Sequence, residues 1–76
     1  MPKVVEEAGY QIVVFSNDHL PAHVHALKEG KAAKFTLTPV ALYENGGFSD
    51  KMVREAIDII RRHKGHCWRV WHETHG

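Results

Sequence analysis

Residues 23–38, HVHALKEGKAAKFTLT, predict two β-strands joined by a tight turn. His23–Lys28 alternates with a period of two, and Ala32–Thr38 places its apolar side chains on one face and Lys34 on the other. The Glu-Gly pair between the two segments is typical of a turn. We therefore expect an antiparallel hairpin whose second strand is half-buried.

The segment upstream of this hairpin predicts two more strands. Val4–Glu6 and Tyr10–Ser16 are rich in β-branched and aromatic residues, and they flank a turn at residues 7–9. Residues 16–21, SNDHLP, are rich in turn formers, and the proline is incompatible with a central strand. We therefore expect a loop between the second and third strands.

The segment downstream predicts a further short strand and then a turn. Pro39 interrupts the alternation, and Val40–Tyr43 resumes it after a bend. Asn45-Gly46-Gly47 strongly favours a turn. The chain up to this point thus predicts four or five short strands.

A helix is predicted to begin after Ser49, which is a good N-cap, and Asp50 suits the positive end of the helix dipole. The apolar residues beyond it recur at helical spacing on one side: Met52, Val53, Ala56, Ile57, Ile60, Cys67, Val70 and Trp71. Gly65 costs a helix interior about 1 kcal/mol relative to alanine, so one long helix, a kinked helix and two helices all remain open. We expect a single α+β domain over residues 1–76, with a small antiparallel sheet followed by this C-terminal helical segment.

The composition argues against several classes of protein. The formal net charge of +1 is too small for a nucleic-acid-binding field over the whole surface. The single Cys67 forms no internal disulfide, and no apolar run approaches the length of about 18 residues that a membrane span needs. We therefore expect a cytoplasmic protein with neither membrane association nor export. Because so short a chain has a small core, a homodimer or a bound partner is also expected.

Seven histidines are the strongest anomaly in the composition. Side chains at positions i and i+2 of a strand share one face, so His23 and His25 should project side by side. This arrangement suits two ligands of one metal ion, or an acid and a base on opposite sides of a phosphate. His19 is placed to reach the same face from the loop, and Asp18 to orient one of the rings. The simpler alternative is a pair of surface or packing histidines.

Basic and aromatic side chains supply further candidates, each with a simpler alternative. Lys34 is a candidate to neutralise the charge of a phosphate. The alternative is that it is a solvated surface lysine without such a role. Four arginines share the polar side of the helical segment: Arg54, Arg61, Arg62 and Arg69. These arginines are candidates to bind the phosphates of a nucleic acid or an acidic protein. The alternative is that they form a solvated helix face without a binding role. Trp68 and Trp71 are expected in the core or an interface rather than as platforms for nucleic-acid bases.

Residues 16–25, SNDHLPAHVH, carry a longer pattern. The pattern S-N-D-H-x-P-x-H-x-H resembles the signature of a small bacterial family, domain of unknown function 4160, and the resemblance covers nearly the whole chain. Weaker landmarks of that family are Gly9-Tyr10, Ala33-Lys34-Phe35, Gly47-Phe48-Ser49 and Trp71. The chain departs from the family at Trp71-His72-Glu73, where Trp-Asn-Glu is usual, and in residues 64–67. Family members look like the toxin half of toxin–antitoxin pairs, which implies an antitoxin partner that covers the histidine block.

Three functions follow from the residues and the resemblance. The leading hypothesis is a toxin-like protein that acts on nucleic acid, as a metal-independent ribonuclease with histidines as acid and base and a cation on the phosphate. The second is a non-enzymatic module that binds a protein or a nucleic acid through the sheet face and the arginines. The third is a zinc site built by His19, His23 and His25, with Asp18 or water as fourth ligand. Whether the protein is an enzyme stays open at this point, and the first two hypotheses need no cofactor.

Overall fold

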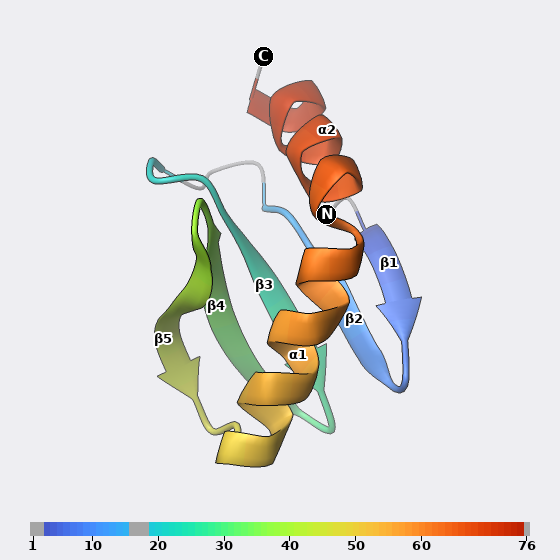
Figure 1. Cartoon of the computed structure of the whole chain (residues 1–76), viewed down its shortest axis with the longest axis vertical. Helices are drawn as coiled ribbons and strands as arrows, with labels where there is room; N and C mark the ends of the chain where they lie inside the picture. The colour runs from blue at the N-terminus through green and yellow to red at the C-terminus, as the bar shows by residue number, and fades with distance from the viewer. Residues whose placement is uncertain (1–2, 16–18, 76) are drawn as a thin grey trace.

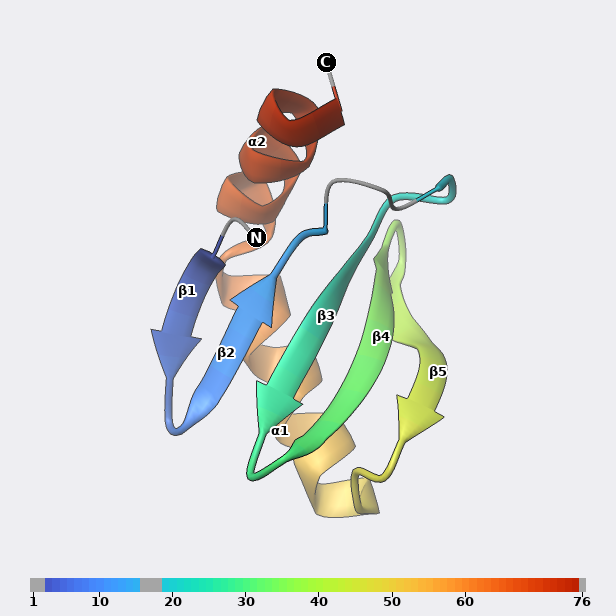
Figure 2. The same cartoon turned by 180° about the vertical axis from the view of Figure 1, so that it is seen from behind.

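The computed structural model describes residues 3–15 and 19–75 and confirms the expected α+β architecture. Five strands form one antiparallel sheet in the order β1-β2-β3-β4-β5. The strands are β1 (Lys3–Glu7), β2 (Tyr10–Val13), β3 (His23–Lys28), β4 (Lys31–Leu37) and β5 (Val40–Gly46). Two helices, α1 (Asp50–Arg62) and α2 (Lys64–His75), lie on one face of the sheet (Figure 1). No helix of these described residues lies on the other face (Figure 2).

Both predicted hairpin turns are present, and each uses two consecutive residues with positive φ. The values are 53° and 83° at Ala8 and Gly9, and 53° and 76° at Glu29 and Gly30. Two consecutive positive φ angles are typical of type I′ turns, whose twist matches that of the flanking strands. Glycine at the second position adopts this backbone without a Cβ clash. The residues of these turns thus join β1 to β2 and β3 to β4 in antiparallel register.

The ends of β1 and β4 differ from the expectation by one residue, and two other strand ends differ by more. The strand predicted for Tyr10–Ser16 ends at Val13, the last of its residues that pairs with both neighbouring strands. The last residue of the predicted strand lies outside the described residues. The strand predicted to end at Tyr43 continues to Gly46, because its pairing with β4 shifts register and then resumes.

The start of α1 is fixed by side chains that bond to the backbone. The Asn45 Oδ1 atom accepts hydrogen bonds from the backbone N–H groups of Gly47 and Phe48, at 3.0 and 2.8 Å. Ser49 has an extended backbone, and its Oγ atom accepts the N–H of Met52 at 3.2 Å. The N-cap prediction is therefore confirmed. The turn predicted at residues 45–47 begins only at Gly47, because Asn45 and Gly46 still pair with β4.

The helical segment is two helices, and the break lies at His63. This residue has φ −118° and ψ 23°, outside the helical range, whereas the neighbouring Gly65 is the second residue of α2. The Nε2 atom of His63 lies 3.1 Å from Oε1 of Glu7 in β1. The position of the break therefore coincides with a contact to a strand far away in the sequence, which the local glycine signal does not reveal.

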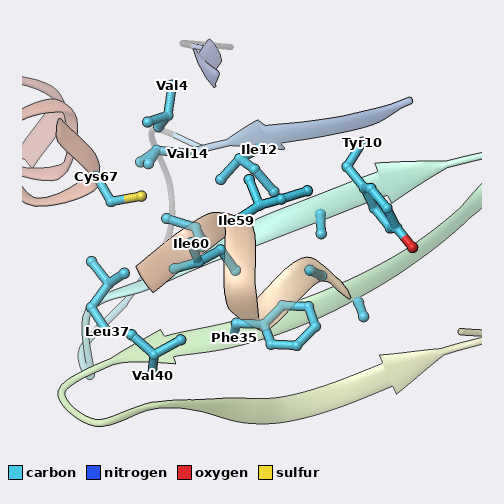
Figure 3. Packing of buried hydrophobic residues seen from close by; sticks show 14 of the residues in the cluster. Val4, Tyr10, Ile12, Val14, Phe35, Leu37, Val40, Ile59, Ile60 and Cys67 are labelled. Atoms are coloured by element: carbon cyan, nitrogen blue, oxygen red, sulfur yellow. The ribbon is translucent and has the colours of Figure 1, made fainter. Parts of the chain in front are cut away.

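The core lies between the helices and the sheet (Figure 3). Alternate residues of the central strands point toward the helices, and the apolar side of each helix packs against them. The fully buried side chains of this cluster include Tyr10, Ile12, Val14, Val24, Phe35, Leu37, Ile60 and Cys67. Trp71 is 5% exposed and belongs to the same cluster, while Trp68 packs against it. The expectation that both tryptophans pack is confirmed.

Glu7 joins β1 to the junction of the two helices. Its carboxylate forms an ion pair with Arg62 and contacts the ring of His63. The hydrogen bonds from Arg62 and then from His63 hold the pKa of the Glu7 carboxyl below its ordinary value of 4.5. The bond to Glu7, and after it the bond to Asp58, raises the pKa of Arg62. This ion pair therefore links an edge strand to the helical layer.

No helix among the described residues is long and apolar enough to span a bilayer.

Replacing Ile60 by alanine should lower the free energy of unfolding by about 2–5 kcal/mol, because the side chain is fully buried and its removal leaves a cavity. Urea unfolding followed by circular dichroism measures this loss. The matched control is Leu20→Ala, since Leu20 is 82% exposed and should change stability little. Equal losses in the two variants would contradict the described packing.

Glu7→Gln should lower the urea midpoint at pH 7 and have progressively less effect as the solution becomes more acidic. Because the folded-state pKa of Glu7 is depressed, its carboxylate stabilises the fold above about pH 4.5, and this contribution is lost as the pH falls through the folded-state value. Glu73→Gln, at an exposed site on α2, is the control. A loss for Glu7→Gln that is the same at pH 7 and pH 3 would contradict the ion-pair assignment.

Candidate functional site

His23 and His25 bring their rings close together at the start of β3. Their ring centroids are 5.4 Å apart, with an angle of 51° between the ring planes. Val24 between them is fully buried in the core under the helices, and the alternation of the strand directs His25 to the other face of the sheet. The ring of His23, at the start of the strand, also lies next to Trp71 of α2. The spacing of the two residues in the sequence correctly predicts that they lie side by side.

His23 is buried and its ring is held by the backbone. It is 5% exposed, and its Nδ1 atom lies 2.9 Å from the carbonyl oxygen of Pro21. A carbonyl oxygen only accepts hydrogen bonds, so Nδ1 carries the proton and donates it. In this tautomer Nε2 is the ring nitrogen that accepts a proton or a hydrogen bond. A histidine with a purely structural role is also commonly buried and bonded to the main chain. The ring of His23 thus has a fixed tautomer, but solvent and ligands reach little of its surface.

His25 lies further along β3 and is half-buried. Its ring meets the edge of Phe15, with centroids 4.3 Å apart and planes at 85°. In the sheet it pairs with Val13 on one side and with Lys34 on the other. His25 therefore belongs to the face that the helices leave uncovered, between an aromatic ring and a lysine.

A shallow depression of about 130 Å³ lies beside His25 on this face. Lys34 and Glu44 line it together with small residues of β4 and β5. The Nζ atom of Lys34 is 3.3 Å from Oε1 of Glu44, and both side chains are more than one-third exposed. A phosphate near His25 would thus meet a cation that already has a carboxylate partner.

Two aromatic residues complete the surroundings of His23, and the sequence prediction of the site did not include them. The ring centroid of Trp71 in α2 lies 5.7 Å from that of His23, and that of Tyr43 in β5 lies 5.9 Å away. Trp71 is buried and stacks with His75 at 3.8 Å, whereas Tyr43 is 55% exposed. Neither contact is local in sequence, and no spacing pattern indicates it.

The other predicted members of the histidine site are not brought together with this pair. His19 is exposed, and it forms no hydrogen bond, ion pair or ring contact with another residue that the structure describes. Asp18 lies outside the described residues. Within residues 3–15 and 19–75, no three His, Cys, Asp or Glu side chains are grouped closely enough to hold a metal ion.

The arginines lie in the helical layer, on the opposite side of the sheet from His25. Arg62 is committed to Glu7 and to Asp58, whose Oδ2 atom lies 3.2 Å from its Nε atom. Arg54, Arg61 and Arg69 are exposed and form no ion pair with any residue in the described part of the chain. The predicted arginine surface and the histidine pair are therefore separate regions of the molecule.

Two further features have no part in the histidine site. A larger depression, of about 390 Å³, lies at the far end of β3, between the two hairpin turns, and no histidine lines it. The thiol of Cys67 is buried among apolar side chains, and this burial raises its pKa to about 11. At neutral pH the group is protonated, so it is no candidate nucleophile.

Comparison with known proteins gives one match. The model of the family described as "Domain of unknown function (DUF4160)" matches residues 9–72. No curated protein matches, and no solved structure matches. The matched range includes both histidines of the pair and the two aromatic residues around His23.

Cys67 should resist alkylation by iodoacetamide at pH 7.5 in the folded protein and react readily in urea. The reason is that burial withholds the sulfur from the reagent and keeps it protonated. Mass spectrometry of the protein after timed labelling measures the difference. Labelling at equal rates with and without urea would contradict the position of Cys67 in the core.

Proposed function

The chain belongs to the family described as "Domain of unknown function (DUF4160)" and, since that description states no activity, we propose a function from the histidine pair: cleavage of RNA without a metal ion. The observation that carries this proposal is the pair itself, two imidazoles 5.4 Å apart, one of which is held by Pro21 through Nδ1. A neutral imidazole held in this way presents Nε2 as a base, and its neighbour supplies an acid.

The reaction needs one base and one acid on a single phosphodiester. One histidine removes the proton of the 2′-hydroxyl group, and the 2′-oxygen attacks phosphorus. The bond from phosphorus to the 5′-oxygen breaks, and the second histidine gives its proton to that oxygen. The products are a 2′,3′-cyclic phosphate and a 5′-hydroxyl end. Lys34 opposite His25 stabilises the negative charge that develops on the phosphate.

We propose further that this activity arrests growth, as in the toxin half of a toxin–antitoxin pair. The support is the position of His25, which lines a depression on the sheet face opposite to α1 and α2. No helix of the described residues covers this face of the sheet (Figure 2). A protein partner that docks on this face would block access to the histidine pair. The antitoxin in this proposal is a small protein with a surface that packs against the uncovered face of this antiparallel sheet.

A second candidate function is binding without catalysis, through the helical layer. The observation that favours it is a set of three exposed arginines that form no ion pair with any residue in the ranges 3–15 and 19–75: Arg54, Arg61 and Arg69. Such a surface suits a phosphate backbone or an acidic protein, with an affinity that falls as salt rises. In this case the arginines and not the histidines carry the function.

His25→Ala should reduce RNA cleavage in EDTA by about 100-fold or more, because acid–base catalysis by one side chain contributes about 10²–10⁴-fold. His23→Asn is the second variant, since its amide nitrogen lies near the position of Nδ1 while Nε2 is removed. Cleavage is measured on a labelled oligoribonucleotide, and growth arrest is measured by induction in cells. The control is His72→Ala, at an exposed histidine of α2.

Three outcomes separate the two candidate functions. Loss of cleavage and arrest in His25→Ala and His23→Asn, but not in His72→Ala, supports the ribonuclease. Unimpaired arrest in both site variants would overturn it. Arrest that is lost instead in a variant with Arg54, Arg61 and Arg69 replaced by alanine, without turnover in the parent protein, supports the binding module.

A further inference from the structure

Tyr43 is an exposed aromatic residue beside the buried histidine. It lies in the edge strand β5, it is 55% exposed, and its ring centroid is 5.9 Å from that of His23. Among the described residues, only two other large hydrophobic side chains, Leu20 and Leu42, are classed as exposed. Because more than half of its surface is accessible, the ring of Tyr43 is available for contact with a ligand at the site of the proposed chemistry.

A β-bulge places Tyr43 at this position. In the pairing of β4 with β5, Phe35 is opposite Leu42 and Lys34 is opposite Glu44, so Tyr43 is the extra residue between two successive pairs. Glu44 lies on the histidine face, where it pairs with Lys34, and Tyr43 directly before it contacts His23. Bulges of this kind re-aim side chains and are frequent next to active sites. The bulge therefore brings an aromatic ring and a charged pair to the same face.

We propose that Tyr43 stacks on a base of the RNA substrate, and that the histidine site therefore takes single-stranded RNA in preference to duplex. This inference rests on the proposed function, since it names the substrate of that site. A base in a duplex is already stacked on its neighbours, whereas an unpaired base is free to stack on an aromatic side chain. Stacking on Tyr43 would hold the nucleotide next to the phosphate that lies between the histidines.

The positive charge beside the histidine pair suits contact with one nucleotide of the RNA rather than with a long stretch of its phosphate backbone. Lys34 is the cation opposite His25, and Glu44 holds it in place. The exposed arginines lie in the helical layer, on the other side of the sheet. Lys34 and the exposed ring of Tyr43 suit one phosphate and one base, which are adjacent parts of a flexible strand.

Binding should be measured in the His25→Ala background, so that turnover does not affect the result. The probe is a fluorescein-labelled single-stranded oligoribonucleotide of about ten nucleotides, with its blunt-ended duplex as the comparison, followed by fluorescence anisotropy at constant salt. Adding Tyr43→Ala should raise the Kd for the single strand by about tenfold, whereas Tyr43→Phe should stay within about twofold. Leu42→Ala, at the neighbouring exposed residue, is the matched control. Circular dichroism confirms that each variant is folded.

The outcomes distinguish this inference from the proposed catalysis. An unchanged Kd in Tyr43→Ala, or equal affinities for single strand and duplex, would overturn the stacking role even if the parent protein cleaves RNA. A Kd that depends on Tyr43, in a protein that shows no cleavage, would support the stacking role and overturn the ribonuclease. Absence of any binding to the single strand would overturn both.

Discussion

The alternation of β3 is the constraint on which the rest of the structure depends. This strand pairs with β2 on one side and β4 on the other, so it lies in the middle of the sheet. Val24 and Ala26 are fully buried under the helices, and the residues between them must face the other way. A shift of one residue in its register would exchange the two sets, which would turn Val24 and Ala26 out of the core and His25 into it. The packing of the core and the position of the histidine pair are therefore fixed by the same interaction.

Burial of His23 has an energetic requirement that the structure meets. A polar ring that is 5% exposed destabilises the fold unless its nitrogen atoms have partners. The Pro21 carbonyl supplies one partner, and aromatic rings from β5 and α2 surround the imidazole. A histidine held in this way keeps one orientation, which is the condition for directed proton transfer. The same contacts reduce the access of solvent, so any substrate must approach along the uncovered face next to His25.

The parts of the structure that sequence predicts well are those that depend on near neighbours. The turn at Glu29-Gly30, the N-cap at Ser49 and the shared face of His23 and His25 follow from local chemistry. The helix break at His63 and the exposed ring of Tyr43 follow from long-range contacts. Glu7 in β1 fixes the first, and the register of β4 against β5 fixes the second. Single-sequence patterns contain no signal for such pairings, which explains why they escape prediction.

The central claim is that His23 is held in its Nδ1–H form beside His25, with Nε2 as the atom for proton transfer. Nuclear magnetic resonance of the imidazole nitrogen atoms in protein labelled with ¹⁵N reports the tautomer directly. The account predicts a proton on Nδ1 of His23, because the Pro21 carbonyl accepts a hydrogen bond from that nitrogen. A neutral ring with its proton on Nε2 would contradict the account, since the bond to Pro21 would be absent and Nε2 would no longer be a base.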